Sequence, residues 1–183
     1  MTRRSDLTPR YRTIVADPPW EYEFASLYPG QPERTREMPY AMLSVREICA
    51  LPVSGMADKD AHLYLWTTQR YLRQSYDVVR AWGFAPASVL VWVKPPKGFV
   101  GTYACSTEFV LFGRRGNLPA KKKVGRNWWE WSRGAHSTKP EAFLDIVESV
   151  SPGPYLELFA RRQRLGWDTW GNEALNHVDL GAA

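Results

Sequence analysis

Five short apolar runs alternate along the chain with segments that carry helical signals, and this alternation constrains the fold more than any other feature. The runs cover residues 13–16, 62–66, 88–93, 108–112 and 155–160. Most are continuously apolar, which is typical of strands buried on both faces. Helices are predicted over 44–51, 68–82 and 138–150. This order predicts an α/β doubly wound domain, with a mainly parallel twisted sheet and helices on both faces.

The three predicted helices begin with residues that favour helix starts. Ser44 and Glu47 have the spacing of a capping box, and Thr68 can cap the second helix. In the third, Thr138 is the expected N-cap, followed by Lys139, a proline in the first turn and an acid near the positive end of the helix dipole. A lysine at that end opposes the dipole, so Lys139 is expected to bind an anion.

Length and composition favour one globular domain. It is expected to span 1–183, with a core at about 11–173 and short flexible termini. Two cysteines suit a reducing compartment, no apolar run is long enough to span a bilayer, and the first ten residues lack the apolar centre of a signal peptide. We therefore expect a soluble cytoplasmic protein. No spacing of His, Cys and acidic residues indicates a metal site.

A basic and tryptophan-rich segment, 114–135, shows no periodicity and is predicted to be a surface loop. The net charge of the chain is +5, and nine of its residues are tryptophan. Lysines followed by exposed indole rings can attract phosphates and stack on bases, as a nucleic-acid surface does. The alternative is a solvated loop whose tryptophans pack against its base. The residues concerned are Lys121, Lys122, Lys123, Trp128 and Trp129.

The first apolar run ends in Asp-Pro-Pro-Trp, which places a carboxylate beside a rigid carbonyl and an indole ring. Asp17 supplies acceptors at the strand end, and Pro19 biases Pro18 toward the extended region, which fixes the Pro18 carbonyl. Two acceptors can bind both hydrogens of an –NH2 group on a flat heterocycle such as adenine, while Trp20 stacks on the ring. The alternative is a turn that ends the strand, with Trp20 in the core.

Polar residues follow several of the predicted strands. Ligands of doubly wound sheets bind beyond the carboxyl ends of the strands. The residues at or just past these ends are therefore expected to converge on one cleft. They are Asp17, Thr67, Lys94, Arg114 and Arg161.

Seven short blocks occur in a fixed order along the chain. They are ADPPW at 16–20, LYLWTT at 63–68, AWGF at 81–84, VWVK at 91–94, HSTKP at 136–140, LELFAR at 156–161 and GWDTWGNE at 166–173. With these blocks the sequence resembles, from about 11 to 173, the β-class amino-methyltransferases that modify adenine. The resemblance is to the branch that includes the catalytic subunit of the messenger-RNA adenosine methylase, with bacterial and phage members.

The resemblance implies a Rossmann-like, S-adenosylmethionine-dependent methyltransferase with a circularly permuted motif order. The catalytic motif then comes early and the cofactor strand late. It implies methyl transfer to the N6 amine of adenine, and we expect DNA as the substrate more than RNA. A nucleic acid is the expected partner, with a homodimer or a partner subunit as further options. The alternatives are a catalytically inactive nucleic-acid-binding subunit of the same fold, or the same chemistry on RNA.

The resemblance also implies roles for single residues. Asp17 and Pro18 would bind the target amine, and Pro19 and Trp20 complete the catalytic motif. The cofactor-binding residues would be Asp17, His136, Ser137, Lys139, Phe159, Arg161, Asn172 and Glu173. The substrate-binding residues would be Trp20, Lys94 and Glu108, together with the lysines and tryptophans of 121–129. His177 is expected in an exposed tail.

Two departures from the family pattern concern the substrate side. Many relatives have a histidine directly before the glutamate, where this chain has Thr107. Gly98 and Gly101 are spaced more widely than the Gly-x-Gly usual in that loop. Neither departure touches the amine-binding or cofactor motifs.

Overall fold

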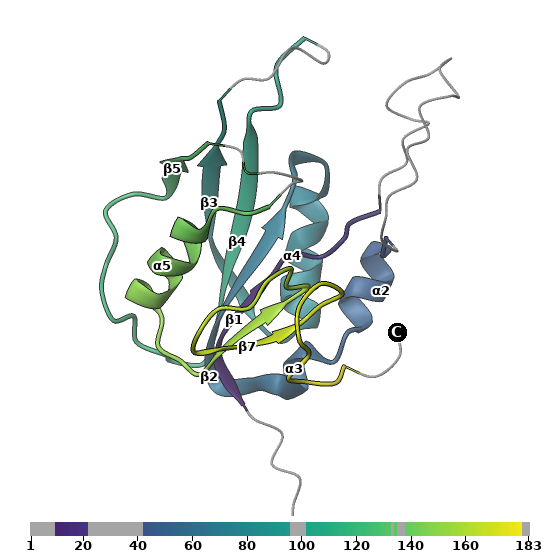
Figure 1. The fold of residues 1–183 in the computed structure, drawn as a ribbon, viewed down its shortest axis with the longest axis vertical. Coiled ribbons are helices and arrows are strands. Elements are labelled where there is room, and N and C mark those ends of the chain that lie inside the picture. Colours follow the sequence, from purple (N-terminus) through teal and green to yellow (C-terminus); the bar gives the residue numbers. More distant parts are fainter. Residues whose placement is uncertain (1–9, 22–41, 96–101, 133, 135–137, 181–183) are drawn as a thin grey trace, which may run out of the picture.

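The computed structural model describes residues 10–21, 42–95, 102–132, 134 and 138–180. Its centre is a seven-stranded sheet with the order β5-β3-β4-β2-β1-β6-β7 (Figure 1). The strands are β1 (Tyr11–Ala16), β2 (Ala57–Thr67), β3 (Ala85–Val93), β4 (Thr107–Arg115), β5 (Trp128–Glu130), β6 (Tyr155–Leu158) and β7 (Trp167–Trp170). The helices are α2 (Val45–Ala50), α3 (Val53–Met56), α4 (Leu72–Ala81) and α5 (Glu141–Val150), with a 3-10 helix at Gln69–Tyr71.

The sheet is mainly parallel, as the alternation of strands and helices predicts. β1 is parallel to β2 and β6, β6 to β7, and β3 to β5. β4 instead runs antiparallel to both of its neighbours, β2 and β3. This direction pairs Arg114 with Ala85 at the amino end of β3. The prediction that Arg114 joins a cleft at the carboxyl ends of the strands is therefore wrong, because an apolar run does not encode the direction of its strand.

Alternating side chains of the central strands face two layers of the core. Leu63 and Leu65 of β2 pack in a cluster with Ile48 of α2 and apolar residues of α4. Tyr64, between them, packs in a second cluster with Phe143 of α5. Figure 1 shows α5 on one side of the sheet, and α2 and α4 on the other. Both faces are thus covered by helices, and the predicted α/β fold class is confirmed.

The helix starts are only partly as predicted. The capping box at the start of α2 is present. Thr68 makes no capping bond with its side chain; a 3-10 helix follows it, and α4 begins only after that. Pro140, rather than Thr138, is the N-cap residue of α5, again without a capping side chain. Lys139 therefore lies just before the first turn of α5.

Two short strands, β5 and β7, are not predicted by the apolar runs of the sequence. β5 lies within the segment predicted to be a surface loop, so that prediction is wrong at 128–130. β7 follows the last strand that the sequence predicts. Each pairs in parallel with a neighbour, β5 with β3 and β7 with β6. Strands this short carry no hydrophobic period of their own and depend on that pairing.

The carboxyl ends of β1, β2, β3 and β6 meet at one edge of the sheet, and the antiparallel β4 begins there. Asp17, Lys94 and Phe159 follow three of these strands, and Glu108 is near the start of β4. Segments distant in sequence thus converge at this edge.

In the described part of the chain, no helix has the length and apolar character needed to cross a membrane. The sequence also predicts a loop at 21–40, which is rich in proline, glycine, tyrosine and glutamate; all of it except Glu21 lies outside the described residues. The extent of the domain, 1–183, stays a prediction.

Candidate active site

Asp17 lies where β1 meets β6. Its backbone N–H donates to the carbonyl of Leu158, the last residue of β6, at 3.3 Å. The two prolines that follow stop β1 at this point, because neither can donate to a strand ladder. Asp17 is thereby held beside Phe159, the first residue after β6.

Four charged side chains form a linked cluster at this edge, with cations and carboxylates in alternation. The Nζ of Lys139 lies 2.7 Å from the Oδ2 of Asp17 and 3.4 Å from the Oε2 of Glu108. The other carboxylate oxygen of Glu108 accepts a hydrogen bond from Lys94. Each of these side chains is only 11–23% exposed. Lys139 is therefore a cation shared by two carboxylates in a largely desolvated site.

The charge of Lys139 is stabilised where it lies. Burial acts to lower the pKa of Lys139, but attraction by Asp17 and Glu108 and hydrogen bonds to both outweigh it and raise the pKa above its usual value. The Nζ of Lys139 also lies 5.3 Å from the ring centroid of Trp66, and that of Lys94 lies 4.6 Å from the ring of Trp92. Such cation–π contacts favour the charged form further.

The Asp-Pro-Pro-Trp turn is rigid, but its tryptophan is mostly buried. The Pro18 carbonyl accepts from the backbone N–H of Trp20 at 2.9 Å. Trp20 is 4% exposed, donates from Nε1 to the carbonyl of Trp66 at 3.0 Å, and stacks on Tyr71 with centroids 5.2 Å apart. These contacts favour the alternative that Trp20 belongs to the core, and its stacking on a base stays a prediction.

Glu157 also lies close enough to Asp17 to feel its charge, and it is not among the residues predicted from the sequence. It lies on β6 opposite Val15, and its Oε2 is buried without a hydrogen-bond partner among the described residues. Burial raises the pKa of Glu157 to about 7, with Arg162 opposing the rise and Asp17 adding to it. The sequence does contain a signal for Glu157, which is a lone acid within the apolar run LELF. Because an unpaired buried carboxylate is costly, an acid in such a run marks a candidate site residue.

Next along the chain, Phe159 has a positive φ of 63°. A bulky residue rarely adopts the left-handed region. Its ring packs edge-on against Trp170 of β7, with centroids 5.3 Å apart. Strained backbone is common at binding sites, and this residue lies at the predicted cofactor strand.

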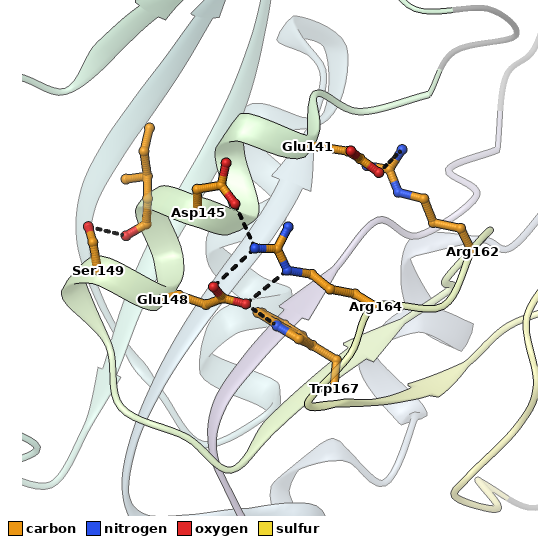
Figure 2. Close-up of polar contacts among 8 residues, drawn as sticks. Glu141, Asp145, Glu148, Ser149, Arg162, Arg164 and Trp167 are labelled. Atoms are coloured by element: carbon orange, nitrogen blue, oxygen red, sulfur yellow. Dashed lines mark hydrogen bonds and ion pairs between the residues drawn. The ribbon is translucent and has the colours of Figure 1, made fainter.

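The segment between β6 and β7 lies along α5, as Figure 2 shows. Arg162 pairs with Glu141 at 3.2 Å. Arg164 pairs with Asp145 at 2.6 Å and with Glu148 at 2.8 Å. Residues three or four apart on a helix share a face, so Glu141, Asp145 and Glu148 form a row on α5. The arginines therefore match a row of acids on α5.

This ion-pair row connects the segment after β6 to Lys139. The Nη2 of Arg162 donates to the backbone carbonyl of Lys139 at 3.3 Å. Glu148 also accepts from the Nε1 of Trp167 at 2.7 Å (Figure 2), and the hydrogen bond from Arg164 lowers the pKa of Glu148. The segment after β6 is thus fixed to the helix that Lys139 precedes.

The predicted pair Asn172 and Glu173 is exposed and lies just past β7. Gly171, before it, lies so close to β6 that a Cβ there would lie 2.6 Å from the backbone nitrogen of Ala160 and nearer still to its oxygen. The start of this turn therefore touches the end of the predicted cofactor strand. Arg161 lies three residues past the end of β6 and is half-buried.

The predicted nucleic-acid surface divides into two parts. Lys121 is bound to the far end of α5: its backbone N–H donates to Val150 and its Nζ to the carbonyl of Glu148 at 2.5 Å. A ten-residue helix is about 15 Å long, so Lys121 lies roughly that far from the end of α5 that faces Asp17. Lys122 and Lys123 are exposed.

The two predicted tryptophans of this surface point in opposite directions. Trp128 is 51% exposed, whereas Trp129 is 7% exposed and stacks on Trp131. Successive residues of a strand point to opposite faces, and β5 imposes that alternation here. Only Trp128 of the two therefore has a ring exposed for stacking. Trp129 packs against its surroundings, which agrees with the alternative that the tryptophans of this segment pack against its base.

Several predictions fall outside the described residues. They are those on His136, Ser137, Gly98 and Gly101. Thr107 is the first residue of β4 and pairs with Val93. Among the residues that the structure describes, no group of three or more His, Cys, Asp or Glu side chains gathers in a way that could hold a metal ion.

Comparison with known proteins gives a consistent result. The MT-A70 family model matches residues 11–173. The type II methyltransferase M.MunI of Mycoplasma sp. is 32% identical over 182 residues, which cover 90% of this chain and 78% of that protein.

Longer eukaryotic proteins are also similar. The N(6)-adenosine-methyltransferase MT-A70-like protein of Drosophila melanogaster is 29% identical over 177 residues, covering 90% of this chain and 27% of that protein. The N(6)-adenine-specific methyltransferase METTL4 of Homo sapiens is 26% identical over 196 residues, covering 92% of this chain and 39% of that protein. The chain thus spans less than half the length of these two relatives.

Proposed function

Because this chain belongs to the MT-A70 family, we propose that it transfers a methyl group from S-adenosylmethionine to the N6 amine of adenine in a nucleic acid. The observation that carries the proposal is the pairing of Lys139 with Asp17 beside the fixed Pro18 carbonyl. A cation, a carboxylate and a rigid carbonyl then lie at one edge of the sheet, where the ligands of such folds bind.

The side chains at this edge fit the amino-acid part of the cofactor. Lys139 is a charged donor suited to a carboxylate, and the buried Oε2 of Glu157 is an acceptor without a partner among the described residues, suited to an ammonium or hydroxyl group. Phe159 and Arg161 would complete this side of the site, and Asn172 and Glu173 would lie near the cofactor ribose, as the resemblance implies. When bound, S-adenosylmethionine supplies a methyl group made electrophilic by its sulfonium.

Asp17 and Pro18 would bind the target amine. A carboxylate has two oxygens, and a carbonyl has two lone pairs, so both can accept from an amine in addition to their present partners, Lys139 and Trp20. Two fixed acceptors favour the tetrahedral nitrogen that forms as the amine attacks, and this lowers the barrier to methyl transfer. The proton leaves after attack, through water.

Access to Asp17 requires an adenine outside the base stack. The amine of a paired adenine is hydrogen-bonded within the duplex, so base flipping or a single-stranded substrate is part of the proposal. Lys94 and Glu108 would lie near the base. The exposed Trp128, with Lys122 and Lys123, would contact flanking nucleotides.

We propose DNA rather than RNA as the substrate. The support is the likeness to a type II methyltransferase over 78% of that protein's length, whereas relatives named as RNA methyltransferases are covered over 52% or less. A second copy of the chain or a partner subunit, and a cytoplasmic location, belong to the same proposal.

The test is an Asp17→Ala variant. Methyl transfer to adenine should be lost, because the amine loses an acceptor, while S-adenosylmethionine binding should stay largely intact, because Lys139 stays. The matched control is Asp77→Ala, which removes an exposed aspartate on α4. Full activity of Asp17→Ala would refute the mechanism. Wild-type protein that binds nucleic acid but not S-adenosylmethionine in calorimetry would instead favour the inactive nucleic-acid-binding subunit.

A further inference from the structure

We propose that Asn176 and His177 are positioning residues for the cofactor, because they fix the turn that presents Asn172 and Glu173 at the end of β7. This inference rests on the proposed function, in which Asn172 and Glu173 lie near the cofactor ribose. Neither Asn176 nor His177 would touch the cofactor. They act through the backbone of the turn, residues 171–175.

Hydrogen bonds close the turn at its base. The N–H of Gly171 donates to the Oδ1 of Asn176 at 2.8 Å. The N–H of Thr169 donates to the Nδ1 of His177 at 3.1 Å, and the N–H of His177 donates back to the carbonyl of Thr169 at 2.8 Å. The Oγ1 of Thr169 donates to the carbonyl of Leu175 at 2.5 Å. The side chains of Asn176 and His177 thus bind backbone donors on the β7 side of the turn.

The turn is also held from outside this hydrogen-bonded base. Gly171 lies against the backbone of Ala160, so the turn cannot shift toward β6. After it, Leu180 is buried, and both Leu180 and Val178 pack in the core cluster with α2 and α4. The tail is therefore anchored at its far end, and this anchor keeps Asn176 and His177 in place.

The position of Asn172 and Glu173 depends on this backbone. Both side chains are exposed. If the turn were free, cofactor binding would have to order it, and the lost conformational entropy would weaken the affinity. A preformed turn avoids that loss. The hydrogen bonds of Asn176 and His177 should therefore increase the affinity for the cofactor without changing the rate of the chemical step.

The experiment measures S-adenosylmethionine affinity by calorimetry, and its KM and kcat in methyl transfer, for paired variants. His177→Ala and Asn176→Ala remove the side-chain acceptors. His177→Asn and Asn176→Asp keep an acceptor near the same point. The control is Leu175→Ala, because Leu175 is exposed and its bond to Thr169 uses the backbone carbonyl.

Each alanine variant should raise the Kd and KM for the cofactor roughly threefold to tenfold, as loss of a hydrogen bond does, with kcat nearly unchanged. The Asn and Asp variants should restore most of the affinity, and Leu175→Ala should match the wild type. Wild-type affinity in both alanine variants would overturn the inference alone. A wild-type protein that binds no S-adenosylmethionine would overturn the proposed function and this inference with it.

Discussion

Lys139→Met tests the shared cation at the centre of the site. Methionine keeps most of the side-chain volume but removes the ammonium that lies 2.7 Å from Asp17 and 3.4 Å from Glu108. Removing one partner of a buried ion pair costs about 3–5 kcal/mol, because the other charge stays desolvated. Glu108 keeps Lys94, and the cluster retains some exposure, so we expect the lower end, roughly 3 kcal/mol of unfolding free energy.

The same substitution, Lys139→Met, should also weaken cofactor binding. A hydrogen bond to a charged group contributes about 1.5–3 kcal/mol, so S-adenosylmethionine affinity should fall roughly tenfold to a hundredfold. Urea denaturation gives the stability, and calorimetry gives the affinity. Lys94→Met is the matched control: Lys94 binds Glu108 without contacting Asp17 in this cluster, so its loss should cost less stability and leave cofactor affinity nearly unchanged. A Lys139→Met protein with wild-type stability and wild-type cofactor affinity would refute the reasoning.

Three further predictions concern the surrounding fold. Burial lowers the pKa of His62. As the pH falls below about 6.5, the unfolded chain therefore takes up a proton at His62 before the folded protein does, and the free energy of unfolding should fall. His62→Gln does not titrate and should lose that part of the pH dependence of unfolding. Arg164→Gln removes the ion pair to Glu148 and should lower the free energy of unfolding by about 1 kcal/mol, measured by urea denaturation. An unchanged urea midpoint would contradict a stabilising role for the ion pairs drawn in Figure 2. Gly171→Ala would force a Cβ onto the backbone of Ala160, so it should lower the free energy of unfolding by about 1–3 kcal/mol and lower the thermal midpoint. An unchanged midpoint would show that Gly171 does not pack closely against Ala160.

Much of the sheet, and the place of Asp17 at the end of β1, follow from local patterns. Continuous apolar runs mark strands buried on both faces, and the two prolines after Asp17 mark where β1 ends. A lysine near the start of α5 predicted an anionic ligand; Lys139 pairs with Asp17 and Glu108 of the chain itself, and its binding to a ligand stays a prediction. Such features depend on one strand or one helix end, which a sequence records directly.

Other features depend on strand direction and register, which no local pattern records. Arg114 lies at the wrong end of the sheet for the cleft because β4 is antiparallel. Trp128 and Trp129 look alike in sequence, yet the alternation of β5 exposes one and buries the other. The role of His177 comes from a bond to Thr169, made only once the tail folds back on β7.

The most direct test of the account is product analysis with the wild-type protein. It would be incubated with S-adenosylmethionine carrying a labelled methyl group and with double-stranded DNA, single-stranded DNA or RNA, and the nucleic acid would be digested to nucleosides. The account predicts label in N6-methylated adenine nucleosides, with more from DNA than from RNA. Label on another nucleoside, or none from any substrate, would contradict it.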